Sequence, residues 1–263
     1  AVLLVAGKID EASTLKLIEE YFGSIPRPTR SLVDVPTIEP VQDGERTVVL
    51  RRVGDTQALA AGYHIMPGSH ADYPAMDVVV ELLTNEPSGR LYKKLVETKK
   101  VSYQYGYSFS LKEPGFVYFG TELLKEKSIE DAKKTLLNTL DSVAIVVPTK
   151  DDVERAKTKL LKDFELAFKS SDRLGLAMSE FIATGDWRLG FIYRDRLEKV
   201  AAEDVQRVAR YYFKPSNRTV GMFIPEEKPE RTEVPDAPDV AAIVKDYKGR
   251  AAVAQGEAFD PSP

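Results

Sequence analysis

The two histidines, His64 and His70, are the first residues to consider for chemistry, because imidazole can bind a metal ion or transfer a proton. A zinc site built on one helix presents two histidines at helical spacing with a glutamate nearby. His64 lies at the end of a predicted strand and His70 falls in a polar turn, so no single helix can present both. We therefore expect a strand-end role for His64 and a solvated loop position for His70, with no metal bound by either.

The sequence also lacks other arrangements typical of catalysis. There is no cysteine, which excludes disulfides, thiolate nucleophiles and thiolate metal sites together. No serine lies in a G-x-S-x-G turn, and no glycine-rich loop has the spacing of a phosphate-binding motif. Two acidic pairs, Asp151-Asp152 and Glu226-Glu227, are interpreted as a helix start and as part of a solvated linker. The sequence thus predicts no catalytic centre within this chain.

A row of aromatic residues is the next candidate for a functional feature. Tyr103, Tyr105, Tyr107 and Phe109 alternate strictly with polar or small residues over positions 102–110. This period of two indicates a strand with one apolar and one polar face. The row could form a ligand platform, but the apolar face of such a strand is more often the buried side of a sheet. We favour the buried interpretation.

Composition describes an ordinary globular protein. The chain has 263 residues, of which 43% are hydrophobic and 30% charged. Its net charge is −4, from 37 basic and 41 acidic residues, and no basic block argues for nucleic acid as a partner. No apolar run approaches the ~18 residues that a membrane-spanning helix needs. We expect neither nucleic acid nor membrane among its partners.

Breaks in the pattern predict four segments. Residues 1–23 look like a buried strand and a helix whose sheet partners lie elsewhere, so we expect the chain to begin inside a longer protein. Residues 24–44 contain four prolines without helical periodicity and are predicted to be a linker. Residues 45–225 form the main domain. Residues 226–263 are rich in proline and charge, which indicates a second linker or tail.

The main domain mixes strands and helices. Strands are predicted over 46–53 and 57–65, with Gly54-Asp55 as a hairpin turn between them. The other predicted elements are helices over 72–83 and from Ser88, strands over 103–111 and 116–124, helices over 129–146, 149–168, 172–183, 187–200 and 203–213, and a strand over 217–224. This order predicts an α+β fold, with an antiparallel sheet and helices packed on one face.

Four segments in this order resemble the pitrilysin/insulinase family of zinc metallopeptidases. They are VLLVAGKIDEASTLKLIEEYFGSIPRP from residue 2, ERTVVLRRVGDTQALAAGYHIMPGSHADYPAMDVVVELL from residue 45, PSGRLYKKLVETKKVSY from residue 87 and PTKDDVERAKTKLLKDFE from residue 148. Their order and spacing make the resemblance more specific than any one piece. Together they cover about residues 1 to 225.

The resemblance implies a pitrilysin-like domain that carries no metal. Family members pair similar α+β domains, and the first carries an inverted H-x-x-E-H zinc motif. Residues 1–23 resemble the end of that zinc-bearing domain, and residues 45–225 resemble the metal-free second domain. We therefore expect no cofactor in this chain and zinc in the parent protein.

The resemblance also suggests one binding residue. The domain that faces the zinc in family members supplies an arginine and, seven residues later, a tyrosine that hold substrate. The matching positions here are Val96 and Tyr103, so the tyrosine is present and the arginine is not. Arg90, Lys93 and Lys94 are nearby but out of register. Tyr103 is thus a candidate for substrate binding, although a packing role is the interpretation that its place in the strand favours.

Three functions remain open at this stage. The resemblance favours a non-catalytic domain of a zinc-dependent metalloendopeptidase that helps to enclose unfolded peptides, inactive as an isolated chain. The alternative is a structural or interaction subunit that partners an active peptidase. The third is an unrelated α+β binding module. In the favoured interpretation the partners are a peptide substrate and the zinc-bearing domain, which belongs to the same chain or to a partner subunit. The expected location is periplasmic or secreted.

Overall fold

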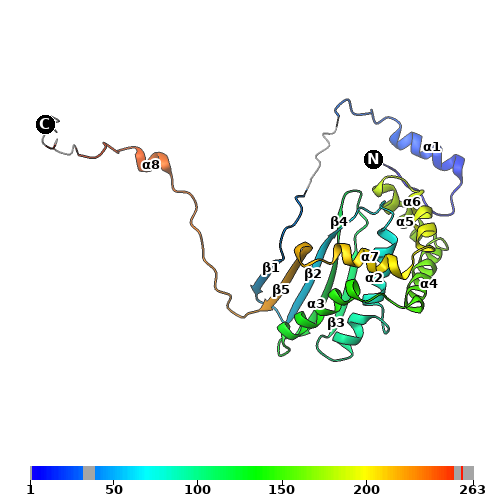
Figure 1. Cartoon of the computed structure of the whole chain (residues 1–263). Coiled ribbons are helices and arrows are strands. Elements are labelled where there is room, and N and C mark those ends of the chain that lie inside the picture. The colour runs from blue at the N-terminus through cyan, green and yellow to red at the C-terminus, as the bar shows by residue number, and fades with distance from the viewer. Residues whose placement is uncertain (1, 32–38, 252–255, 257–263) are drawn as a thin grey trace, which may run out of the picture. The chain divides into compact units, whose positions relative to one another are not determined.

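The computed structural model describes residues 2–31, 39–251 and 256 (Figure 1). The chain divides into two compact units, Ala1–Lys228 and Pro229–Pro263. The second unit contains the short helix α8 (Val240–Val244). The first unit contains the sheet and the helices that position the candidate site. In the described part of the chain, no helix is long and apolar enough to cross a membrane.

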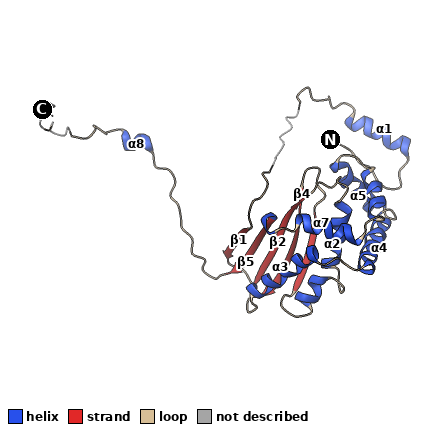
Figure 2. Ribbon diagram, in the orientation of Figure 1, coloured by secondary structure: helices blue, strands red, loops and turns tan. Residues whose placement is uncertain are grey.

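A five-stranded sheet organises the first unit (Figure 2). Its strands are β1 (Arg46–Arg52), β2 (Thr56–Ile65), β3 (Tyr103–Ser108), β4 (Gly115–Leu124) and β5 (Arg218–Pro225). The strand order is β1-β5-β2-β4-β3. Each strand lies where the sequence predicts one, and the predicted combination of one sheet with helices is confirmed.

The predicted hairpin between β1 and β2 is wrong. β5 lies between them, parallel to β1 and antiparallel to β2, so the sheet is mixed rather than wholly antiparallel. Gly54 carries the chain across the end of β5, where a Cβ atom would come within 2.9 Å of the Phe223 ring. A Gly-Asp pair between two strands is a sound local turn signal, but it cannot show that a distant strand separates them.

Helices cover one face of the sheet. They are α2 (Tyr73–Thr84), α3 (Ile129–Ile145), α4 (Lys150–Ala167), α5 (Ser171–Thr184), α6 (Leu189–Leu197) and α7 (Ala202–Tyr212), with a π-helical turn over Tyr92–Val96. Helices α3 and α7 pack on β2, and α2 packs on β3. The side chains of Ser128 and Thr149 cap α3 and α4 by accepting hydrogen bonds from the backbone amides of Asp131 and Asp152.

The core lies between these helices and the sheet. On β2, the alternate residues Leu59, Ala61, Tyr63 and Ile65 are all at most 2% exposed. The Tyr63 ring stacks on Phe213 at a centroid distance of 4.7 Å. Since successive strand residues point to opposite faces, the residues between them lie on the other side of the sheet. We call that side the open face.

The amino-terminal segment forms a helix without a core. Helix α1 (Glu11–Phe22) is capped by Asp10 as predicted, but none of its residues is buried. The strand predicted near residues 2–6 is not formed, and Val2 is 69% exposed. A strand needs a neighbour to satisfy its backbone hydrogen bonds, and the described residues offer this segment none. Its assignment to a preceding domain remains a prediction, as do the other domain boundaries.

The end of the first linker is tied to the sheet through Arg218. The Gln42 side-chain amide donates to the Arg218 carbonyl at 2.8 Å. The buried Arg218 guanidinium bonds Glu45 at 2.6 Å and Asp141 of α3 at 2.9 Å. This cluster joins the linker, β5 and α3 at the point where the domain begins.

Candidate functional site

The open face of β3 and β4 carries six aromatic rings, which we call the aromatic cluster. Its members are Tyr103, Tyr105, Tyr107, Phe109, Phe116 and Tyr118. The two strands are antiparallel, and their pairing sets Tyr107 opposite Tyr118 and Tyr105 opposite Gly120. Side chains at paired positions point to the same face, so the pairing assembles the rings into one surface.

The rings contact one another from end to end of the cluster. Tyr105 and Tyr107 lie 5.7 and 5.9 Å from Tyr118, measured between ring centroids. Phe109 stacks on Phe116 at 4.5 Å. Aromatic pairs at these separations stabilise a strand pair by about 0.5–1.5 kcal/mol beyond the area they bury. The rings of the cluster therefore pack together as one ordered surface and do not behave as independent side chains.

The cluster faces outward, which corrects the expectation of a buried aromatic stripe. Tyr103 and Tyr107 are 49% and 52% exposed, while Gln104 between them is 2% exposed. The polar positions of β3 therefore point toward the helices and the aromatic positions toward the open face. The strand and its period were predicted correctly, but its two faces were assigned the wrong way round.

Close packing of α2 explains this reversal. The buried Gln104 amide donates to the Thr84 carbonyl at the end of α2, at 2.7 Å. A Cβ atom on Gly106 would come within 2.8 Å of the Thr84 methyl group and 2.6 Å of Phe119. Ser108 donates to Asp77 of α2 at 2.5 Å. The Phe119 ring of β4 and helix α2 already fill this side, so β3 places small and polar residues there, and Gln104 and Ser108 form hydrogen bonds to α2.

A floor of short side chains lies beside the aromatic cluster. Its residues alternate along the three central strands: Ala58, Ala60, Gly62, Gly120 and Gly221. A Cβ atom on Gly120 would collide with the Tyr105 ring, which therefore lies flat over β4. A Cβ atom on Gly221 would meet nothing within 4 Å. The open face is thus low over the alanine and glycine positions of β2 and over Gly221, and raised along β3 and β4, whose Tyr105 ring covers Gly120. Phe223 of β5 lies on the same face beside Ala58.

The buried carboxyl group of Asp77 fixes β3 from behind. It accepts hydrogen bonds from Ser108 of β3 at 2.5 Å and from Tyr193 of α6 at 2.7 Å. Burial raises the pKa of Asp77 to about 6, although both hydrogen bonds favour the ionised form. Asp77 is not among the site residues predicted from the sequence, where its one signal is a charge between the apolar residues Met76 and Val78.

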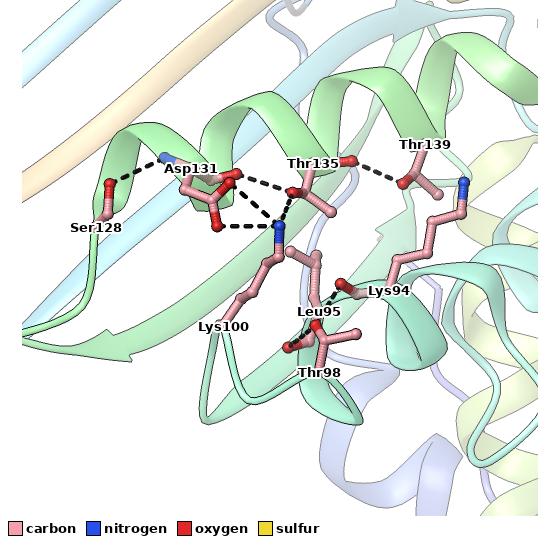
Figure 3. A network of polar contacts seen from close by, with 8 residues as sticks. All are labelled: Lys94, Leu95, Thr98, Lys100, Ser128, Asp131, Thr135 and Thr139. Carbon is pink, nitrogen blue, oxygen red and sulfur yellow. Dashed lines mark hydrogen bonds and ion pairs between the residues drawn. The ribbon is translucent and has the colours of Figure 1, made fainter.

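A lysine holds the loop that leads into β3 (Figure 3). The Lys100 ammonium bonds Asp131 at 3.1 Å and the Thr135 hydroxyl at 2.9 Å, both on α3. The preceding residue, Lys99, has a φ of 58°, so the chain turns sharply there. Together these features set where Tyr103 begins the strand.

The structure separates the residues that the family resemblance placed together. Val96 lies partly buried against the core, whereas Tyr103 is on the open face. Arg90 and Lys93 line a cavity of about 940 Å³ formed with α2 and α4. Lys94 is exposed, and its carbonyl accepts a hydrogen bond from the Thr98 hydroxyl at 2.7 Å (Figure 3). None of these three cations therefore lies beside Tyr103 to take the place of the missing arginine. Of the residues that the resemblance singled out, Tyr103 is the one on the open face.

The histidines lie in separate places. The ring of His64 contacts Glu39 at 3.2 Å, and His70 accepts a hydrogen bond from the Asp72 amide at 3.1 Å. Among residues 2–31, 39–251 and 256, no group of three or more histidine, aspartate or glutamate side chains could hold a metal ion. The residues present do not fit a zinc site, so no chemical step of this chain is assigned to zinc.

Comparison with known families identifies the chain. The family model of the peptidase M16 inactive domain matches residues 1–160. The chain belongs to this family. A zinc protease of Helicobacter pylori, PqqE, is 25% identical over 231 residues, which cover 86% of this chain and 51% of that protein. This M16 chain therefore spans about half the length of that curated relative.

Solved structures agree with this assignment. The inactive peptidase domain of a Bordetella parapertussis protein is 39% identical and has a TM-score of 0.62, over 70% of this chain and 99% of that one. A protease from Helicobacter pylori gives a TM-score of 0.78 at 22% identity, over 84% of this chain and 54% of that one. The second likeness shows the shared fold. The Bordetella parapertussis structure, which is covered almost completely by this chain, shows that a similar inactive domain crystallises on its own.

Proposed function

We propose that this M16 inactive domain is part of a longer zinc-dependent metalloendopeptidase and that its open face forms one wall of a chamber for unfolded peptides. In the parent protein, a zinc-bearing domain would supply the chemistry. The chain described here would bind and orient peptide. The open face carries the proposal, because it is an ordered aromatic surface that the helices of the first unit leave uncovered.

The form of this surface supports a peptide ligand. The raised aromatic cluster borders a low floor of alanine and glycine along β2, with Gly221 of β5 beside it. An extended peptide can lie along such a floor and place its apolar side chains against the rings. Tyr103 and Tyr107, each about half exposed, are the rings with the most surface left to bury. Tyr103 therefore takes the substrate-binding role in this proposal.

Two matched variants test the wall. An unfolded, uncharged peptide with apolar side chains is titrated into the chain, and the tyrosine ring signals are followed by NMR. We expect Tyr107→Ser to weaken binding about three- to tenfold, because it removes a ring from the middle of the surface. Tyr211→Ser is the control, because it removes a 63% exposed ring from α7 instead. Equal losses in both variants, or no binding at all, would refute the proposal.

A second test concerns the parent activity. Zinc content and cleavage of an unfolded peptide are measured on this chain and on the chain rejoined to the sequence upstream of it in its gene. We expect the chain alone to bind no stoichiometric zinc and to cleave nothing, and the longer protein to do both. Tight one-to-one zinc binding by the dialysed chain would contradict the assignment. An inert longer protein would instead favour a structural or interaction subunit.

We also propose that the protein works in the periplasm or outside the cell, where unfolded peptides would be its substrates. The proposal is checked by fractionating the source cells and probing each fraction with an antibody against this chain. Recovery in the cytoplasmic fraction would overturn it.

A further inference from the structure

Glu122 is an unpaired carboxylate within the open face. It lies on β4, paired across the strands with Tyr103 on one side and Ala58 on the other. Its side chain is exposed, and it has no ion pair among the described residues. Lys125, the next cation along the chain, bonds Asp55 instead at 3.7 Å.

Among the described residues, no other charge of the open face pairs with Glu122. Alternation places Arg46 and Arg52 of β1 on this face, and their strand is separated from β4 by β5 and β2. It also places His64 of β2 there, and the His64 ring contacts Glu39. The carboxylate therefore leaves a local negative charge between the aromatic cluster and the short side chains of β2.

Two tyrosine rings beside Glu122 also favour a positively charged ligand. Tyr103 faces Glu122 directly in the register, and Tyr105 is the next ring of the cluster, 5.7 Å from Tyr103. Ring faces attract ammonium and guanidinium groups through their quadrupoles. Ala58, on the other side of Glu122, leaves room for a long aliphatic stem. A carboxylate beside two rings and a short neighbour suits a lysine or arginine side chain.

We propose that Glu122, Tyr103 and Tyr105 form a subsite for one basic side chain, lysine or arginine, of a peptide lying on the open face. The inference rests on the proposed function, because it needs a peptide on that surface. It adds a substrate preference: the wall selects peptides with a basic residue next to apolar ones. The cation would pair with the Glu122 carboxylate while its stem crosses Ala58 and its charged group contacts the rings.

The test uses a set of unfolded peptides that differ at one central position. That position holds arginine, lysine, citrulline or glutamate, and citrulline keeps the shape of arginine without its charge. Affinity for the full 263-residue chain is measured by NMR titration at low salt. We expect the arginine and lysine peptides to bind about three- to tenfold more tightly than the citrulline peptide, and the glutamate peptide to bind most weakly.

Variants assign the preference to the subsite. Glu122→Gln should bring the arginine peptide within twofold of the citrulline peptide, and Glu122→Lys should favour the glutamate peptide. Glu126→Gln removes an exposed carboxylate from the turn after β4 and should leave the preference unchanged. Glu122 is exposed, so these variants should fold, and circular dichroism confirms that they do.

The outcomes separate the two proposals. If the four peptides bind with affinities within twofold, the open face binds peptide but the basic subsite is wrong. If the arginine preference survives in Glu122→Gln, the cation binds elsewhere and the assignment is overturned. If no peptide binds, the proposal that the open face binds peptide is refuted, and the proposed subsite is refuted with it.

Discussion

The buried carboxyl of Asp77 gives the sharpest prediction for this domain. It joins α2, the aromatic strand β3 and helix α6 through two neutral hydroxyl donors, and no cation bonds it among the described residues. Burial raises its pKa from 3.8 to about 6. The folded chain therefore binds this proton more tightly than the unfolded chain. The resulting stability is fully present below about pH 3.8 and is lost as the pH rises through about 6.

The size of the effect follows from linkage. With those two pKa values, the contribution of Asp77 to the free energy of unfolding falls by about 2 kcal/mol between about pH 4.5 and about pH 7.5. Asp77→Asn mimics the protonated carboxyl and does not titrate. We therefore expect the free energy of unfolding of the variant, relative to that of the natural chain, to rise by about 2 kcal/mol as the pH increases over this interval. Urea unfolding of both proteins at both pH values measures the difference.

Asp72 provides a control of opposite sign on the same helix. Hydrogen bonds from Arg207 lower the pKa of Asp72, so its stabilising charge is present at neutral pH and is lost in acid. Asp72→Asn should therefore be most destabilising near neutral pH and least destabilising in acid. If the stability difference between Asp77→Asn and the natural chain stays flat with pH, the carboxyl is not enclosed as described, and the reasoning fails.

Two further predictions concern the ends of the domain. Arg218→Met should destabilise the domain by about 3 kcal/mol in urea unfolding, because it leaves Glu45 and Asp141 without their shared cation; a loss below about 1 kcal/mol would show that the cluster is not structural. Amide hydrogens of α1 should exchange with solvent much faster than those of β2, because α1 has no buried residue. Strong protection of α1 in a dilute monomer would indicate a partner surface for residues 1–23.

The elements themselves could be predicted because their signals are local. Period-two alternation located β3, and the helices predicted over 129–146 and 149–168 match α3 and α4. The neighbour of a strand is not a local property. The sequence around Gly54 is the same whether β1 pairs with β2 or with β5, and the choice depends on a strand more than 150 residues away. The hairpin prediction failed for that reason.

The assignment of the two faces of β3 failed for a different physical reason. Hydrophobicity favours aromatic residues in the core, but the space between the strand and its neighbours decides which face of the strand can hold a ring. Helix α2 comes so close to β3 that a methyl group on Gly106 would collide with Thr84, and the rings must point away. Asp77 was missed because a single charge in an apolar helix does not show whether donors from two other elements will meet it.

These two failures bear on the same functional point. The helical side of β3 is packed so tightly that it is filled with polar groups bonded to α2, among them Gln104 and Ser108. Six rings on the opposite side then have no internal partner layer to bury them. The exposed rings, with Glu122 beside them and without an ion pair among the described residues, are the observations on which the proposed binding of an extended peptide with a basic side chain rests.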